Sequence, residues 1–214
     1  MDFDGKVKNC GPVDISTIKK KVQGLAPRAW KKDSAGRKNL AGSRPGNALF
    51  VITDTPDKHS WNSYEGMLNG MINVYSGGGW NLLNKPTMEL IRDHVMPIYS
   101  DCLPIKIQYA ELPPSKTIDP HRDGGILAEI HRLHVPLITH TCVKFYIENE
   151  QFFLEEGYLY ELNNVKSHAV RNTSNIMRIH LLIDMIPKEK SDVLYHSKVG
   201  NMNKGKNFDE FFNA

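Results

Sequence analysis

Two residues with metal-binding side chains stand close together in the stretch DPHRDGG, residues 119–125. His121 and Asp123 are two positions apart, so on an extended segment both side chains point to the same side. An imidazole and a carboxylate can hold a divalent metal on one face if a third ligand joins them. The alternative for this pair is a turn in which Asp123 bonds only its own backbone.

A histidine that can complete the set is His168, in the strand-like stretch NNVKSHAVRN. Two histidines and one carboxylate form the facial triad of non-haem Fe(II) oxygenases, which leaves metal positions open for other ligands and dioxygen. The sequence therefore predicts a metal site made of His121, Asp123 and His168. Asn163 and Asn164, which begin the preceding turn, either support His168 or serve as ordinary turn residues.

An arginine follows in NIMRIHLLID. Alternation with a period of two predicts a strand with two faces, one carrying Arg178, His180, Leu182 and Asp184 and the other carrying Met177, Ile179, Leu181 and Ile183. Both faces are rather apolar near Arg178, and a buried arginine requires an anion because an unpaired buried charge is very costly. A dicarboxylate co-substrate supplies that anion in the fork geometry that arginine prefers. A salt bridge to a neighbouring strand is the alternative.

The stretch IHRLHVPLI adds a second arginine and a further histidine. The same alternation places Arg132, His134 and Pro136 on one face of a strand, and His131, Leu133, Val135 and Leu137 on the other. Arg132 and His134 therefore point together, next to the loop that carries His121 and Asp123.

The elements that must position these residues change in character along the chain. After residue 103, short segments rich in β-branched and aromatic residues follow one another between turn signals, which predicts an antiparallel sandwich, a barrel or a jelly roll. The part before it predicts a helix in residues 12–25, a loop, a strand at ALFVITD and a helix in residues 85–101. We interpret 1–214 as one domain, with a helical and loop-rich part (1–103), a β core (104–186) and a polar tail (187–214).

Three further features lie in the N-terminal part and the tail, and the first two each have two possible interpretations. The aromatic and glycine-containing segments with Trp61, Tyr64 and Trp80 either fold over a binding site or are plain surface connections. Between residues 19 and 44 nine Lys or Arg stand against one acid, Asp33, which either meets an acidic partner or is a solvated surface. In the tail, FDEFF predicts a short docking helix.

Composition narrows the class of protein. A hydrophobic content of 40%, a charged content of 24% and a net charge of +3 are ordinary for a soluble globular protein. The three cysteines are far apart without a CxxC pair, which argues against a disulfide framework or a zinc ribbon. No secretory signal and no membrane-spanning apolar run is visible, so we expect a cytoplasmic protein without a membrane partner.

The ordered motifs LPPSKTIDPHRDGG, RLHVPLITH and YELNNVKSHAVRNTSNIMRIHLLID resemble the aspartyl/asparaginyl β-hydroxylase-like family of Fe(II)- and 2-oxoglutarate-dependent dioxygenases. The resemblance covers about residues 104–186 and implies a mainly β fold with flanking helices, built on a double-stranded β-helix of the jelly-roll or cupin kind. It implies Fe(II) as the metal and 2-oxoglutarate as the co-substrate. The implied reaction hydroxylates an unactivated C–H bond of an amino acid or peptide side chain and releases succinate and CO2.

Carried over by position, the resemblance implies iron ligation by His121, Asp123 and His168. Arg178 would bind the distal carboxylate of 2-oxoglutarate, while Arg132 and His134 would contact its metal-chelating end. Some members of the family carry glycine in place of the carboxylate ligand, so the presence of Asp123 places this chain with the members that have the full triad. A co-substrate-binding serine of the family has no clear counterpart here, and Gln108 or Tyr109 are the candidates.

Two other classes of function remain open. A metal-binding cupin with non-redox chemistry, such as an isomerase or a small-ligand sensor, could use the same ligands with Zn or Mn. A non-enzymatic module could bind nucleic acid through the basic segment, although no nucleic-acid-reading motif accompanies it. The arginine on the last core strand favours the dioxygenase. The individual substrate and the oligomeric state are not readable from the sequence.

Overall fold

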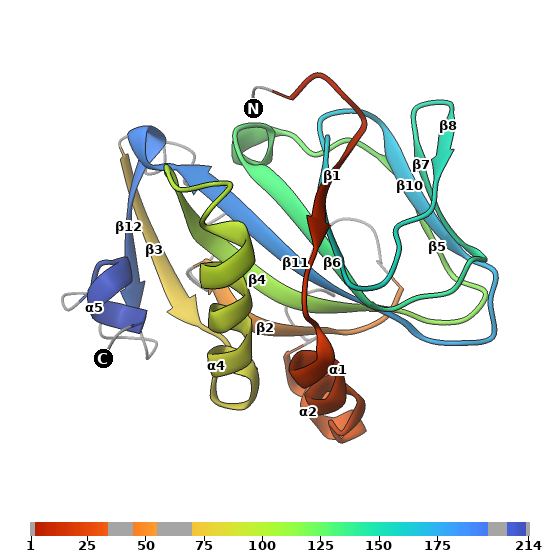
Figure 1. Ribbon diagram of the computed structural model, residues 1–214, viewed down its shortest axis with the longest axis horizontal. Coiled ribbons are helices and arrows are strands. Elements are labelled where there is room, and N and C mark those ends of the chain that lie inside the picture. Colours follow the sequence, from red (N-terminus) through yellow and green to blue (C-terminus); the bar gives the residue numbers. More distant parts are fainter. Residues whose placement is uncertain (1–2, 34–44, 55–69, 197–204, 213–214) are drawn as a thin grey trace.

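The structure is a computed structural model that describes residues 3–33, 45–54, 70–196 and 205–212. Two β-sheets face each other, and helices cover the outer face of the larger sheet (Figure 1). Trp61 and Tyr64, together with most of the second half of the basic segment, lie outside the described residues.

The larger sheet has eight strands within the described ranges, antiparallel except for the pair β3–β12. In spatial order its strands are β1 (Val7–Pro12), β9 (Tyr158–Leu162), β6 (His131–Ile138), β11 (Arg178–Pro187), β4 (Cys102–Leu112), β2 (Ala48–Asp54), β3 (Gly70–Ser76) and β12 (Ser191–His196).

The smaller sheet supplies the opposite wall of the β core and lies at the right of Figure 1. Its strands, in spatial order, are β5 (Thr117–His121), β10 (His168–Asn172), β7 (Val143–Ile147) and β8 (Glu150–Phe152). All of its strand pairs are antiparallel.

The helices come mainly from the N-terminal part of the chain. They are α1 (Ser16–Gln23), α2 (Pro27–Asp33), α4 (Trp80–Leu90), which continues into a π-helical turn (Ile91–Val95), short 3₁₀ turns (Gly125–Ala128 and Lys188–Lys190) and α5 (Phe208–Phe212). No helix among the described residues is long and apolar enough to cross a membrane.

The central strands β4 and β11 pair over their full length, with Ile183 opposite Ile107 and Leu181 opposite Tyr109. These four side chains belong to the large hydrophobic core, which also includes Leu83 and Met88 of α4. The predicted alternation is confirmed, because the alternate residues Arg178 and Leu182 line a cavity on the other face of the sheet. One face of this sheet thus packs against helices, and the other carries the polar residues of interest.

Four strands were not expected from the sequence, and one of them is β5, which carries His121 in a segment predicted as a loop. β1 precedes the first predicted helix, β3 occupies part of a segment predicted as a loop, and β12 lies in the tail predicted as polar. Each is short and lies at or near a sheet end, where pairing rather than a long apolar pattern supports the strand. In β12, for example, Val193 and Tyr195 are buried beside the parallel partner β3. The interpretation of 1–214 as one domain stays a prediction.

The C-terminal helix α5 docks as predicted, with Phe211 and Phe212 against Trp80 at ring-centroid distances of 5.1 and 5.6 Å. Tyr195 of β12 packs on the same two phenylalanines. The reading of Trp80 as a residue that folds over a binding site is therefore wrong, because the side chain is used to hold α5.

Candidate active site

His121 and His168 come from neighbouring strands of the smaller sheet. They are direct partners across the antiparallel pair β5–β10, and their ring centroids are 4.2 Å apart. Asp123 follows β5 at a buried position. One ligand atom from each of the three residues lies within 4.8 Å of the other two. The structure thus brings together the three residues predicted as ligands; that they bind a metal stays a prediction.

Each imidazole is oriented by a backbone carbonyl two residues before it. Nδ1 of His121 donates to the carbonyl of Asp119 at 2.8 Å, and Nδ1 of His168 donates to the carbonyl of Lys166 at 2.9 Å. A carbonyl only accepts, so the proton of each neutral ring is on Nδ1 and the lone pair is on Nε2. Both histidines therefore have the tautomer that binds a metal through Nε2.

The protonation state of His168 also suits a ligand. Burial lowers the pKa of His168 from its ordinary value, and the hydrogen bond to the Lys166 carbonyl opposes this only in part. The imidazole is consequently neutral at neutral pH, which is the state in which histidine binds a metal.

Asp123 is held by the turn that precedes β10. Its backbone N–H donates to the carbonyl of Asn164 at 2.9 Å, and its Oδ2 accepts a hydrogen bond from Nδ2 of Asn164 at 3.5 Å. Asn164 thus supports the Asp123 carboxylate, whereas the sequence left open whether the two asparagines support His168 or are ordinary turn residues. The side chain of Asn163 instead donates to the carbonyls of Phe3 and Gly5, which attaches the N-terminal segment to this turn.

Arg132 lies between two carboxylates. Its Nε and Nη2 donate to Oδ1 and Oδ2 of Asp184 at 2.8 and 2.9 Å, and its Nη1 donates to Oδ2 of Asp123. Burial opposes the charge of Arg132, but Asp184 and Asp123 outweigh this and raise its pKa, so the guanidinium stays charged. The predicted contact between Arg132 and a co-substrate stays a prediction.

Sequence reasoning gave Asp184 no role. The one indication in the sequence was that Asp184 shares the predicted Arg178 face of β11. Nothing near Asp184 in the sequence indicates that its partner is Arg132. Asp184 is the cross-strand neighbour of Arg132 in the β6–β11 register, and that pairing joins residues far apart in the chain.

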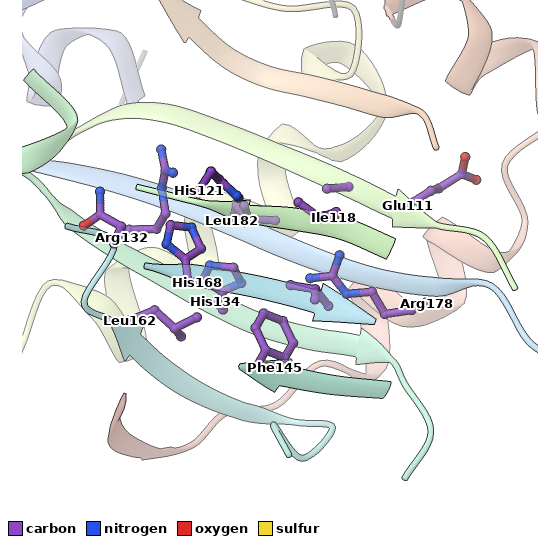
Figure 2. Close-up of a pocket in the computed structure, with 13 residues that line it drawn as sticks. Glu111, Ile118, His121, Arg132, His134, Phe145, Leu162, His168, Arg178 and Leu182 are labelled. Atoms are coloured by element: carbon purple, nitrogen blue, oxygen red, sulfur yellow. The ribbon is translucent and has the colours of Figure 1, made fainter. Parts of the chain in front are cut away.

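A cavity of about 50 Å³ lies between the two sheets beside this cluster. Figure 2 shows His121, His168 and Arg132 toward one end, Arg178 at the other, and His134 between them. The residues that line it are Ala110, Glu111, Ile118, His121, Arg132, His134, Phe145, Leu162, Asn164, His168, Val170, Arg178 and Leu182. Charged and polar side chains therefore lie at both ends, and His134 lies between them.

Arg178 is the first residue of β11 and only 2% exposed. Its guanidinium carbon lies 5.4 Å from the ring centroid of Phe145, which projects from β7 of the smaller sheet. An aromatic face at this distance attracts a cation. Phe145 in turn stacks against His180 at a centroid distance of 5.5 Å. The arginine end of the cavity is thus built by both sheets.

His134 contributes a polar atom to the middle of the cavity. Its Nδ1 is buried and has no hydrogen-bond partner among the described residues. Burial lowers the pKa of His134 well below its ordinary value, and Arg178 and Arg132 lower it further. A neutral imidazole with a buried nitrogen in need of a partner is suited to a ligand that brings a polar group.

The two candidates on β4 point in opposite directions. The hydroxyl of Tyr109 shares a hydrogen bond of 2.6 Å with Thr87 of α4, in the core on the helical side of the sheet. Tyr109 as a co-substrate contact is therefore wrong. Gln108 is the cross-strand neighbour of the cavity residue Leu182, so it remains the candidate on this strand.

The donor chemistry of the cluster fits a divalent transition metal. Two imidazole nitrogens and one carboxylate form the set used by non-haem Fe(II) oxygenases, and three ligands leave further coordination positions for co-substrate and dioxygen. Of the described residues, this is the one group of His, Cys, Asp or Glu side chains close enough to hold a metal ion.

Two facing sheets place this protein in the class of double-stranded β-helix proteins, and the His–Asp–His cluster lies between the sheets. Residues 83–187 match the family described as Aspartyl/Asparaginyl beta-hydroxylase. The resemblance expected from the sequence motifs is thereby confirmed for this part of the chain.

Solved structures share the fold. AviO1 from Streptomyces viridochromogenes Tue57 has a TM-score of 0.51 and 12% identity, with 85% of this chain and 89% of that chain covered. A protein from Burkholderia pseudomallei described as an oxidoreductase of the 2OG-Fe(II) oxygenase family has a TM-score of 0.50 and 10% identity, with 85% of this chain and 95% of that chain covered. At these identities the likeness shows the fold alone, and the predicted fold class is confirmed.

A conserved protein of unknown function from Streptococcus pyogenes aligns with 41% of this chain at 17% identity and a TM-score of 0.31, and the chain spans 66% of that protein's length. Comparison with curated proteins gives no significant match.

Proposed function

We propose that this protein is an Fe(II)- and 2-oxoglutarate-dependent dioxygenase that hydroxylates an unactivated C–H bond of an amino acid or a peptide side chain. In the balanced reaction, one atom of O2 enters the C–H bond, the other enters succinate, and 2-oxoglutarate loses CO2. The observation that carries the proposal is a single cavity with His121 and His168 toward one end and the buried Arg178 at the other.

The metal would be held by Nε2 of His121, Nε2 of His168 and the carboxylate of Asp123, for which the tautomers and the support of the carboxylate are already set. When bound, Fe(II) supplies the redox chemistry that couples the decarboxylation of 2-oxoglutarate to the hydroxylation. The protein orients the reactants and excludes water.

Arg178 would bind the carboxylate of 2-oxoglutarate that is remote from the metal. A guanidinium reads a carboxylate through two parallel hydrogen bonds, which fixes the direction of the ligand as well as its position. The ring of Phe145 restricts the guanidinium from one side. A diacid bound in this way spans the cavity from Arg178 toward the histidine end.

His134 lies between these two ends, and Arg132 lines the end with His121 and His168. We assign to His134 a hydrogen bond to the chelating end of the co-substrate, because its neutral imidazole has a buried nitrogen without a protein partner among the described residues. Arg132 lies at the same end, but three of its N–H groups are directed to carboxylates of the protein. The apolar wall, including Ile118, Leu162 and Val170, would exclude water from this space.

The proposed substrate class rests on the family whose model residues 83–187 match. We place the reaction in the cytoplasm because Cys10, Cys102 and Cys142 are free thiols, which is typical of a reducing compartment.

The decisive experiment is anaerobic titration of the protein with Fe(II) and then 2-oxoglutarate, followed by exposure to oxygen in a screen of free amino acids and peptides. We expect 2-oxoglutarate to bind only after the metal, and succinate to form in proportion to hydroxylated product. A protein that binds metal without binding 2-oxoglutarate would instead be a non-redox metal-binding cupin, and the proposal would be wrong.

A further inference from the structure

The carboxylate of Asp184 is buried at 2% exposure on β11, on the strand that also carries Arg178. It is the cross-strand neighbour of Arg132 on β6. Both of its oxygens accept from Arg132, at 2.8 Å from Nε and 2.9 Å from Nη2, which is the bidentate arrangement with the highest geometric specificity. The guanidinium is planar, so these two bonds fix its plane and its direction.

The opposite edge of the same guanidinium faces the metal cluster. Nη1 of Arg132 donates to Oδ2 of Asp123, one of the three predicted ligands. The backbone of Asp123 is fixed separately, through the carbonyl of Asn164. Arg132 therefore restricts the rotation of the Asp123 carboxylate, and Asp184 restricts Arg132.

The charges of Asp123, Arg132 and Asp184 also connect Asp184 to the metal cluster. A guanidinium that contacts a metal ligand weakens metal binding, because its positive charge repels the ion and is attracted to the ligand carboxylate. The carboxylate of Asp184 offsets this charge at hydrogen-bond distance. With Asp184 present, the group of three contributes one net negative charge to the metal site; without it, the contribution is zero.

We propose that Asp184 is a positioning residue of the metal site, which acts through Arg132 to orient the ligand Asp123 and to preserve its charge for the metal. The proposal rests on the proposed function only in taking His121, Asp123 and His168 as metal ligands. It assigns Arg132 primarily to a ligand carboxylate rather than to the co-substrate.

The test is metal affinity, measured by titration of the metal-free protein with Mn(II) in the absence of co-substrate. Outer partners of metal ligands typically contribute about 10- to 100-fold to metal affinity, so we expect Asp184→Asn to weaken Mn(II) binding by about that factor. The electron paramagnetic resonance spectrum of bound Mn(II) should also change, because the ligand carboxylate is no longer fixed.

A matched control is Glu161→Gln. Glu161 is a carboxylate of β9 that is equally buried, at 1% exposure, and it accepts hydrogen bonds from Tyr99 at 2.8 Å and His131 at 2.6 Å. Its loss should lower the melting temperature but leave Mn(II) affinity unchanged. If Asp184→Asn weakens metal binding no more than Glu161→Gln does, Asp184 is merely structural and the proposal fails.

A variant that lacks the ligand carboxylate tests whether Asp184 acts through Asp123. In Asp123→Gly, the ligand carboxylate is absent and only the charge of Arg132 is left to act on the ion, so adding Asp184→Asn should weaken Mn(II) binding by a smaller factor than it does when Asp123 is present. An undiminished 10-fold effect in that background would overturn the proposed action through Asp123.

If Asp184→Asn does not fold, Arg132→Lys tests the proposal instead. Lysine keeps the charge but cannot bridge two carboxylates, so we expect Mn(II) binding to weaken. Unchanged Mn(II) affinity in Arg132→Lys would refute the proposal. These measurements need no turnover, so a protein that binds Mn(II) as described but releases no succinate would overturn only the proposed function.

Discussion

His121 and His168 face each other directly across β5 and β10, and each ring donates Nδ1 to the carbonyl two residues before it. Directly paired residues of an antiparallel sheet have their Cβ atoms only about 4.5–5.5 Å apart, so the register of this one strand pair sets the separation of the two imidazoles. The sheet therefore positions both nitrogens before any metal arrives, and the carboxylate from the following loop completes the cluster.

Replacing either histidine should remove metal binding with little loss of folding. Both rings are only partly buried, and the Nδ1 hydrogen bond of each ring reaches only a carbonyl two residues away. We expect His121→Ala and His168→Ala each to weaken Mn(II) or Fe(II) binding by more than about 100-fold, since even outer partners of a ligand contribute 10- to 100-fold. The exposed His140→Ala is the control. Retained 2-oxoglutarate decarboxylation in both variants would defeat the ligand assignment.

Arg178→Lys should separate co-substrate binding from metal binding. Lysine keeps the charge but loses the paired hydrogen bonds, and a hydrogen bond to a charged group contributes about 1.5–3 kcal/mol. The KM for 2-oxoglutarate should rise by about 10- to 100-fold, while the iron content stays unchanged; Arg178→Ala should raise it further. The control is Arg171→Ala, an exposed arginine of β10. An unchanged 2-oxoglutarate affinity in both Arg178 variants would make this residue structural.

Phe145→Leu should weaken 2-oxoglutarate binding through Arg178. The ring of Phe145 holds the guanidinium at 5.4 Å, and a desolvated cation–π contact contributes about 2 kcal/mol. We therefore expect the dissociation constant to rise by about 5- to 30-fold. Phe152→Leu is a close control, because Phe152 is the cross-strand partner of Phe145 on β8 but does not line the cavity. Equal effects of the two substitutions would show that only packing is involved.

Local spacing and alternation predicted much of the site. His121 and Asp123 could be grouped from a two-residue spacing, and the faces of β6 and β11 followed from period-two alternation, because these strands have one polar and one apolar row. What the sequence could not show is pairing between distant strands. The contact of Asp184 with Arg132 depends on the β6–β11 register, and the turn residue Asn164 reaches Asp123 only through the way the two sheets meet.

The fold was predictable where hydrophobic patterns are long and poorly so elsewhere. β4 and β11 are long and carry a continuous apolar row, and both were expected. β12 has only two buried apolar residues in a polar tail, and it forms because a parallel partner, β3, provides its hydrogen bonds. That partner is far away in the sequence, so no local pattern indicates it.

Asn172→Ala should destabilise the protein strongly. Asn172 is fully buried, and its Nδ2 donates to the carbonyls of Leu112, Pro113 and Ile176, which joins the ends of β4, β10 and the turn before β11. An amide group has two N–H bonds to lose, and an unsatisfied buried acceptor costs about 1–3 kcal/mol, so we expect a loss of about 2–6 kcal/mol in unfolding free energy. Urea denaturation measures it, with the exposed Asn175→Ala as the control; equal stabilities would refute the argument.

The buried His180 should make stability depend on pH. Neither of its ring nitrogens has a partner among the described residues, and its neighbours are the ring of Phe145 and the edge of His134. Burial lowers the pKa of His180 well below its ordinary value, and the positive charge of Arg178 and the nearby His134 lower it further. The folded protein therefore keeps this imidazole neutral under conditions in which the unfolded chain takes up a proton.

The direction in which the unfolding free energy changes with pH follows from this difference in protonation. Above the ordinary histidine pKa of about 6.5, neither state is protonated and His180 causes no pH dependence. As the pH falls below that value, only the unfolded chain gains the proton, so the unfolding free energy decreases by about 1.4 kcal/mol per pH unit for each such histidine. His134 is shifted in the same direction and adds a similar slope.

His180→Leu removes one of these two contributions and replaces a buried polar ring by an apolar side chain of similar size. Between about pH 6 and 5, the slope of unfolding free energy against pH should become shallower by about 1.4 kcal/mol per unit, and stability at pH 5 should rise relative to the unchanged protein. His140→Leu, which removes an exposed histidine, should leave the slope unchanged. A His180→Leu variant with the original slope in urea denaturation would mean that the folded protein accommodates the charged imidazole.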